Sequence, residues 1–353
     1  MSGLYIHVPF CERKCSYCAF YSVDSTDETR IGSFFDSLKN ELDSLPNDFS
    51  PETIFIGGGT PSAPDFKYLE EFFPLFRRFS PQEFSVEVNP GSGDEAKLSL
   101  FKGSGVNRLS IGVQSFNSDC LDTLGRIHSA EEAEHAFHLA RRIGFDNISI
   151  DLMFGTPGQT LAMLEEDLER VIALGPEHVA IYNLMYEEGT PMAARQDRLD
   201  EDLEREMYDL IRARLAAAGF EHYEISNFAK PGFECQHNLL YWTGGEYIGC
   251  GPAAHSHWSG TRWANVSDLD DYCANGPRRE FEETLDADEK ERETLVMGLR
   301  LLRGVDVGHD LFERKRSLFQ RLATEGLLVI DGRRVRLSED ALFVSDSVLA
   351  ELV

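Results

Sequence analysis

The sequence predicts an α/β protein: a partial (β/α)6 TIM-type barrel followed by a small C-terminal domain of winged-helix type. Predicted strands and helices alternate six times before Met185, which is the pattern of a parallel sheet with right-handed crossovers. Several strands keep one polar face, and the polar residues gather near the strand carboxyl ends, as in a barrel that holds a polar ligand at that rim. After Met185 the alternation stops, and from about Ala287 the chain turns helical.

In most of the six predicted strands apolar residues alternate with polar ones, and the sixth is more uniformly apolar. One face of each strand is therefore expected to pack under helices, and the other to face the barrel lumen. Six units rather than eight predict an open barrel, wide enough for a large cofactor. The strands are expected at residues 4–8, 53–56, 84–90, 108–114, 147–154 and 178–185, with helices at 27–45, 65–79, 94–102, 130–143 and 160–174.

The chain beyond the barrel changes character. A helix is expected over 201–218 and a strand over 221–228, followed by a stretch rich in glycine and aromatic residues. The last part is expected to hold helices over 289–302 and 311–325 and a wing over 327–337, turning at Asp331–Gly332. The predicted parts are 1–190 for the barrel, 191–286 for an extension on its ligand side, and 287–353 for the C-terminal domain.

Composition excludes several classes of protein. The net charge of −27 argues against non-specific nucleic-acid binding, which needs a basic surface. No apolar run approaches the roughly 20 residues of a membrane span, and the N-terminus lacks the features of a signal peptide, so we expect a cytoplasmic protein. The acidic surface is either an adaptation to salt or ordinary for a cytosolic protein, and composition leaves both open.

The first predicted strand leads directly into three cysteines in a CxxxCxxC pattern, Cys11, Cys15 and Cys18. Three thiolates can bind three irons of a 4Fe-4S cluster and leave the fourth iron open. The alternative is a structural zinc ion held by the same cysteines and His7. Strand alternation aims His7 at the lumen beside Tyr5, which favours iron–sulfur, but the spacing alone leaves zinc open.

The second predicted strand ends in Gly57-Gly58-Gly59-Thr60. Glycines let the backbone approach a ligand closely and leave N–H groups free to point at it. A glycine run on its own is more often a turn, but between a strand and a helix it favours a binding loop.

Several segments together resemble one family. YIHVPFCERKCSYCAF, IFIGGGTPS, EVNPG, RLSIGVQSF, LGRIHS and SIDLMFGTPGQT are similar to segments of the oxygen-independent coproporphyrinogen III oxidase family, within the radical S-adenosylmethionine superfamily. The resemblance covers nearly the whole chain. It implies a barrel of radical S-adenosylmethionine type and a 4Fe-4S cluster on Cys11, Cys15 and Cys18. In that superfamily the open iron chelates S-adenosylmethionine, which an electron from the cluster then cleaves.

The resemblance also implies the residues that bind S-adenosylmethionine. Matching positions lie on four predicted strands and on the loops that follow the strands. They are Tyr5, Gly58, Gly59, Thr60, Glu87, Gln114, Arg126 and Asp151. Acidic side chains suit a cationic amine or ribose hydroxyls, and an arginine suits a carboxylate.

Two departures from the dehydrogenases, and one further motif, resemble the haem-chaperone branch of this family. Phe20 stands where the dehydrogenases have a fourth cysteine, and only four residues precede Tyr5, where they carry an N-terminal extension. The HNxxYW motif over 237–242 is typical of the chaperone branch. Its His237 is a candidate to ligate or position haem, and the alternative is that this motif only packs between barrel and C-terminal domain.

The resemblance therefore implies a haem chaperone that carries haem to acceptor apoproteins, such as those of the respiratory chain. The alternative function is oxidative decarboxylation of coproporphyrinogen III, and we expect that activity to be absent. Whether S-adenosylmethionine is cleaved is left open. So are peripheral membrane contact and the choice between monomer and dimer.

Overall fold

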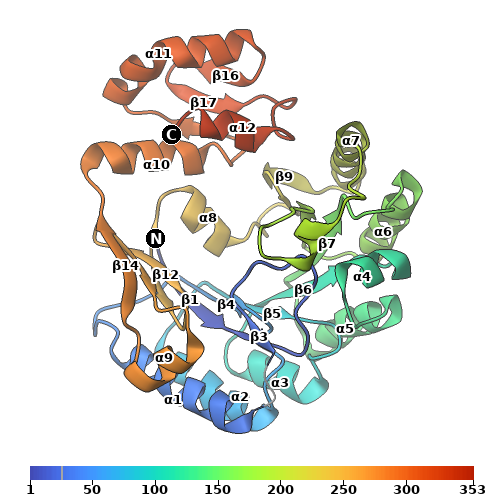
Figure 1. The fold of residues 1–353 in the computed structure, drawn as a ribbon, viewed down its shortest axis with the longest axis vertical. Helices are drawn as coiled ribbons and strands as arrows, with labels where there is room; N and C mark the ends of the chain where they lie inside the picture. Colours follow the sequence, from blue (N-terminus) through green and yellow to red (C-terminus); the bar gives the residue numbers. More distant parts are fainter. Residues whose placement is uncertain (25–26) are drawn as a thin grey trace.

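The computed structural model describes residues 1–24 and 27–353. Its centre is a twelve-stranded sheet in the order β14-β13-β12-β11-β1-β4-β5-β6-β7-β8-β10-β9 (Figure 1). The run from β11 to β8 is parallel throughout. Its members are β11 (Glu246–Cys250), β1 (Ser2–Val8), β4 (Thr53–Gly58), β5 (Glu83–Val88), β6 (Arg108–Gln114), β7 (Ile148–Phe154) and β8 (His178–Asn183). The six predicted strands are confirmed, and β11 adds a seventh parallel strand that the sequence analysis did not predict.

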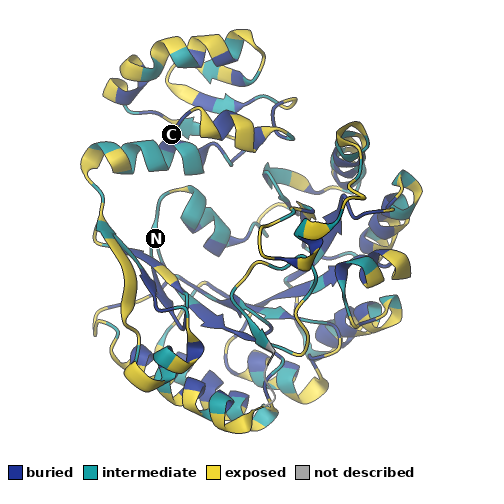
Figure 2. Ribbon diagram, in the orientation of Figure 1, coloured by how far each residue is buried: buried dark blue, intermediate teal, exposed yellow. Residues whose placement is uncertain are grey.

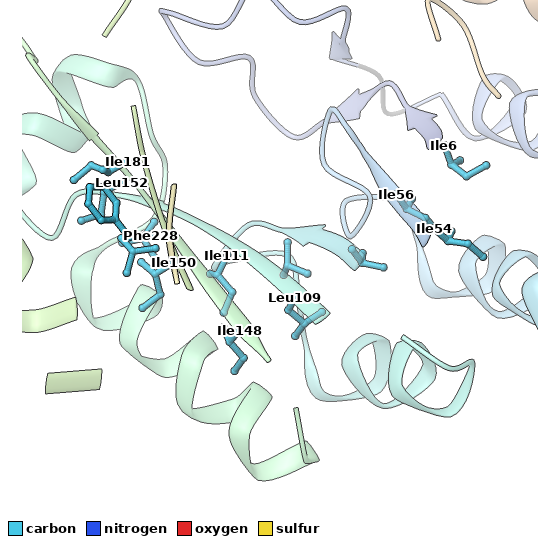
Figure 3. Close-up of a cluster of buried hydrophobic side chains, with 14 of the residues drawn as sticks. Ile6, Ile54, Ile56, Leu109, Ile111, Ile148, Ile150, Leu152, Ile181 and Phe228 are labelled. Carbon is cyan, nitrogen blue, oxygen red and sulfur yellow. The ribbon is translucent and has the colours of Figure 1, made fainter. Parts of the chain in front are cut away.

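The two faces of the parallel strands differ as predicted. Leu4, Ile54, Leu109 and Ile148 are fully buried on the face that meets the helices. Figure 3 shows such side chains from successive strands forming one continuous apolar layer. The opposite face carries the polar residues, so burial of the apolar layer fixes which side chains point into the lumen.

Helices cover the apolar face, with their outer sides exposed (Figure 2). They are α1 (Glu28–Asp43), α2 (Phe66–Phe72), α3 (Glu95–Gly103), α4 (Ser118–Leu124), α5 (Ala130–Ile143) and α6 (Leu161–Leu174). The short α4 was not predicted. α2 is shorter than predicted because the 3-10 helix η1 (Phe73–Arg78), with Pro74 in its first turn, replaces its second half. Within the described ranges, no helix combines the length and apolar character that crossing a membrane requires.

Antiparallel strands extend both ends of the parallel sheet. Beyond β8, after α7 (Glu201–Ala217), the single strand predicted over 221–228 is wrong: β9 (Glu221–Glu224) and β10 (Asn227–Ala229) form a hairpin. The Glu224 side chain accepts from the backbone N–H of Ser226 and the amide of Asn227, so a turn forms without glycine or proline. The other end holds β12 (His255–Trp258), β13 (Thr261–Asn265), α9 (Leu269–Asn275) and β14 (Arg279–Thr284).

The C-terminal part forms a separate small unit above the barrel (Figure 1). A three-stranded sheet in the order β15-β17-β16 packs with helices, and the predicted wing is the β16–β17 hairpin. The elements are α10 (Ala287–Gly298), β15 (Val305–Asp306), α11 (His309–Thr324), β16 (Leu328–Asp331), β17 (Arg334–Leu337) and α12 (Ser345–Ala350). The predicted boundaries at 190/191 and 286/287 stay predictions.

Candidate functional site

The cysteine loop begins where β1 ends. Cys11 closes the short strand β2 (Phe10–Cys11), which pairs with β3 (Val23–Asp24). Burial raises the pKa of Cys11 and of Cys18, and negative charge on Cys15 would raise both further, so the three thiols lie within electrostatic reach of one another. Among the described residues, no three His, Cys, Asp or Glu side chains are gathered tightly enough to hold a single metal ion.

The middle of this loop is fastened to the end of α4. The backbone N–H of Ser16 donates to Leu124 O at 3.0 Å, and its hydroxyl donates to Thr123 O at 3.0 Å. The next residue, Tyr17, packs against a small apolar cluster that contains Leu124 and Met192. The loop between Cys15 and Cys18 is thereby held at the carboxyl end of the strands.

His7 is already committed to two hydrogen bonds. Its Nε2 donates to the carbonyl of Tyr21 at 2.8 Å, so its Nδ1 is the acceptor for the Tyr5 hydroxyl at 3.1 Å. Burial lowers the pKa of His7, which keeps the ring neutral. These contacts count against the Cys3His zinc site, because neither ring nitrogen of His7 is free to serve as the fourth zinc ligand.

The glycine loop packs directly on the start of the cysteine loop. Gly59 N–H donates to Val8 O at 2.8 Å, and Thr60 N–H donates to Phe10 O at 2.7 Å. Gly58 has a φ of +107°, and a Cβ at Gly59 would lie 2.7 Å from Phe10 O. Glycine is required at both positions: a Cβ at Gly58 would strain the backbone and meet the His7 ring at 2.6 Å, and one at Gly59 would force the two loops apart.

Two carboxyl groups stand side by side in the lumen. Burial and the charge of Asp151 raise the pKa of Glu87 to about 8, although the N–H of Gly58 donates to its Oε2 at 3.2 Å. Burial also raises the pKa of Asp151, which accepts from the hydroxyls of Ser110 and Ser149 at 2.9 Å each. Both side chains keep some accessible area, and that area faces the internal cavity described next. Such a pair suits a ligand that carries positive charge.

Beneath these carboxyls is a cavity of about 180 Å³, lined by β1, β4 to β8, β10 and α8 (Gln236–Trp242). Tyr5, Glu87 and Asp151 line it, and Arg108, only 2% exposed, contributes a buried positive charge. Arg108 and Asp151 lie within electrostatic reach of each other, which tempers the negative charge of the lumen.

Arg126 connects the cysteine loop to β5 and β6. Its Nη1 donates to Cys15 Sγ at 3.3 Å, and its Nη2 donates to Asn89 Oδ1 at 2.8 Å and Gly112 O at 2.6 Å. Its buried Nε has no hydrogen-bond partner in the described protein, so one N–H is left over for a ligand. Gln114 lies beside this group, at a bulge, with a φ of +67° that is rare outside glycine and typical of functional sites.

His237 lies at the opposite end of the barrel. It belongs to α8, whose first N–H groups, those of Gln236 and His237, donate to the carboxylate of Glu83 at the amino end of β5. Its Nδ1 bonds Thr53 Oγ1 and its Nε2 bonds Tyr241 Oη, both at 2.8 Å, and the residue is 1% exposed. These contacts favour the packing alternative for the HNxxYW motif, because both ring nitrogens are used.

The structure therefore gathers most of the predicted binding residues at the carboxyl ends of the strands, and His237 lines the far side of the cavity that Tyr5, Glu87 and Asp151 also line. The gathered set is Tyr5, Gly58, Gly59, Thr60, Glu87, Gln114, Arg126 and Asp151, together with Cys11, Cys15 and Cys18. Asn89 was not among the predicted site residues, yet it bonds Thr60 as well as Arg126. The sequence signal that could have identified Asn89 is its position on the polar face of the strand, where it follows Ser85 and Glu87 at a spacing of two residues.

These residues fit a 4Fe-4S cluster and S-adenosylmethionine. Three thiols come from one loop, and hydrogen-bond donors from Thr60 and Arg126 reach two of them. Beside them are a glycine loop, two carboxyl groups suited to a cation, and the unpartnered N–H of Arg126 suited to a carboxylate.

Comparison with known proteins identifies the family of this chain, several relatives and a solved structure with the same fold. The model of the radical SAM superfamily matches residues 5–171, and that of the HemN C-terminal domain matches residues 285–344. Heme chaperone HemW of Bacillus subtilis (strain 168) is 37% identical over 93% of this chain and 93% of its own. Heme chaperone HemW of Escherichia coli (strain K12) is 40% identical over 72% of this chain and 69% of its own. The solved structure of coproporphyrinogen III oxidase (HemN) from Escherichia coli, a radical SAM enzyme, has the same fold, with a TM-score of 0.86 at 22% identity over 99% of this chain and 89% of that chain.

Proposed function

Because this chain belongs to the radical SAM superfamily and to the family of HemW haem chaperones, we propose that it binds a 4Fe-4S cluster, S-adenosylmethionine and haem, and delivers haem to acceptor proteins. The observation that carries this proposal is the identity of 34–40% to proteins named heme chaperone HemW, extending over most of the chain. A cytoplasmic location and acceptors in the respiratory chain belong to the same proposal.

Cys11, Cys15 and Cys18 would hold three irons of the cluster. When bound, the cluster would supply single electrons to S-adenosylmethionine at its open iron. Arg126, whose Nη1 donates to Cys15 Sγ, would stabilise negative charge on that ligand.

The remaining predicted residues would hold S-adenosylmethionine. Glu87 and Asp151 would attract its positively charged groups, and ionisation of Glu87 on binding would strengthen that attraction. The free Nε of Arg126 would take its carboxylate. Thr60 and the backbone of Gly58 and Gly59 would border its methionyl end, where absence of a Cβ allows close approach.

The dehydrogenase alternative is less well supported. Phe20 stands in the cysteine loop where the dehydrogenases have a fourth cysteine, and its side chain is 71% exposed. The match to the oxidase structure concerns the fold, which these proteins share whatever their chemistry.

The first test is anaerobic reconstitution with iron and sulfide. We expect a brown protein with about four irons per chain, and loss of the colour in Cys15→Ser but not in the matched control Cys273→Ser, which lies far from the loop in sequence. If the wild-type protein contains zinc in place of iron, the proposal that it holds a 4Fe-4S cluster is wrong.

The second test separates chaperone from enzyme. The reconstituted protein is titrated with haem and then mixed with an apo-cytochrome, and we expect the haem absorbance to move to the cytochrome. A parallel sample receives S-adenosylmethionine, a reductant and coproporphyrinogen III. Formation of protoporphyrinogen there, without haem transfer, would establish the dehydrogenase alternative instead.

A further inference from the structure

Two of the three cysteines are joined by an unbroken line of side-chain hydrogen bonds. Thr60 Oγ1 donates to Cys11 Sγ at 3.7 Å, and Asn89 Nδ2 donates to Thr60 Oγ1 at 2.8 Å. On the other side, Arg126 Nη2 donates to Asn89 Oδ1 at 2.8 Å, and Arg126 Nη1 donates to Cys15 Sγ at 3.3 Å. Asn89 is the middle of this line, and among the described residues its side chain bonds Thr60 and Arg126 rather than either cysteine.

The direction of every bond in the line follows from chemistry. Arginine can only donate, so the Asn89 atom that faces Arg126 must be the amide oxygen. The amide nitrogen then faces Thr60 and donates to its hydroxyl oxygen. Because that oxygen already accepts a hydrogen from Asn89, the Thr60 hydroxyl hydrogen is directed to Cys11. A side-chain amide is needed at the centre, since it combines a donor and an acceptor in one flat group.

The surrounding backbone holds Asn89 in this orientation. The N–H and the hydroxyl of Ser92 both donate to the carbonyl oxygen of Asn89, at 3.1 and 3.2 Å. Gly112 on β6 leaves room for this pair. A Cβ at Gly112 would lie 3.1 Å from Asn89 Oδ1, which is closer than most Cβ contacts, and 3.6 Å from Arg126 Nη2, which is an ordinary contact. The site is therefore shaped around the Asn89–Arg126 pair before any ligand binds.

We propose that Asn89 is a positioning residue that orients Thr60 and Arg126 and so directs a hydrogen bond to each of Cys11 and Cys15. Hydrogen bonds to ligating sulfur atoms withdraw electron density and favour the reduced cluster. The same orientation fixes two side chains that border the proposed S-adenosylmethionine site. This inference rests on the proposed function, because it assigns Asn89 a role toward the cluster named there.

The sharpest variant is Asn89→Asp, which has the same shape but no donor. An ionised carboxylate accepts from Thr60 as well as from Arg126, so the Thr60 hydrogen turns away from Cys11. Asn89→Ala removes both links without adding charge. The matched control is Asn117→Asp, because Asn117 caps α4 and aspartate caps a helix equally well while adding the same charge.

The readout is the midpoint potential of the reconstituted cluster, followed by electron paramagnetic resonance during reductive titration. We expect a shift to more negative potential in both Asn89 variants and an unchanged potential in Asn117→Asp. The dissociation constant for S-adenosylmethionine should rise about tenfold or more in both Asn89 variants. A purely structural role would lower thermal stability but leave the potential of the assembled cluster where it is.

The outcomes distinguish this inference from the proposed function. If wild-type protein assembles no cluster, the proposed function itself is wrong. If wild type assembles a cluster and Asn89→Ala has the wild-type potential and affinity, the role of Asn89 is wrong and the function stands. Should the added charge of Asn89→Asp prevent folding, Asn89→Ala carries the same test.

Discussion

The backbone N–H of Gly58, at the end of β4, donates to Oε2 of Glu87, at the end of β5, across 3.2 Å. This bond ties the glycine loop to a carboxyl group whose pKa is about 8, raised by burial and by the charge of Asp151. The hydrogen bond and the charge of Arg108 favour the ionised form, but they do not outweigh burial. At neutral pH and without ligand, Glu87 is therefore mostly protonated.

The raised pKa of Glu87 predicts how stability depends on pH. Between pH 4.5 and 8 the folded chain holds a proton on Glu87 that the unfolded chain has lost. Stability therefore falls as pH rises through this window, by roughly 5 kcal/mol at most if the whole shift is counted. Glu87→Gln, which is neutral throughout, should lose less stability than wild type between pH 6 and 9 in urea unfolding of the apoprotein.

The control for this measurement is Glu71→Gln, at an exposed position of α2. It removes the same charge from the surface, so its pH dependence should follow that of wild type. Parallel curves for wild type and Glu87→Gln would show that Glu87 is not held in its protonated form.

Gly59 should not tolerate alanine. The added Cβ would lie 2.7 Å from Phe10 O and 2.9 Å from Pro9 C, and both are backbone atoms that cannot rotate away. We expect Gly59→Ala to cost about 1–3 kcal/mol of unfolding free energy and to weaken cluster assembly, because the cysteine loop starts at those atoms. Gly91→Ala is the control, since no heavy atom lies within 4 Å of its added Cβ; an equal loss in both variants would contradict the steric explanation.

Salt should stabilise the protein. The chain has 61 acidic and 34 basic residues, so even complete pairing, as in the Arg30–Asp270 contact, leaves excess negative charge. Raising KCl from 0.05 to 1 M shortens the screening length to about 3 Å and relieves this repulsion, while exposed pairs lose little. A rise in melting temperature on the order of a few degrees is expected. A flat or falling melting temperature would favour the ordinary cytosolic surface instead.

The barrel could be predicted because its signals are local. Strands such as Arg108–Gln114 alternate polar and apolar residues, so this pattern fixes strand positions and the face that forms the lumen, even though most residues on both faces are buried. Parallel strands in sequence order then bring Glu87 and Asp151 to the same rim without any knowledge of distant contacts.

Other features depend on contacts that span the chain. β11 pairs with β1 across more than 240 residues of sequence, and nothing in the sequence Glu246–Cys250 indicates that β1 is its partner. Asn89 gained its importance only from its distances to Thr60 and Arg126. For His237 too, sequence reasoning offered both a haem role and a packing role, and only its contacts with Thr53 and Tyr241 favour packing.

His237→Ala should therefore cost stability rather than haem binding. The substitution removes two hydrogen bonds and the stacking of the ring on Phe55, whose centroid lies 5.3 Å away. Burial lowers the pKa of His237 to about 3, so the lost interactions are those of a neutral ring at every working pH. We expect a loss of about 2–4 kcal/mol in urea unfolding, with unchanged stoichiometry and absorption maximum of bound haem. His135→Ala, at an exposed position of α5, should change neither quantity, and a displaced haem absorption maximum in His237→Ala alone would make His237 a haem ligand after all.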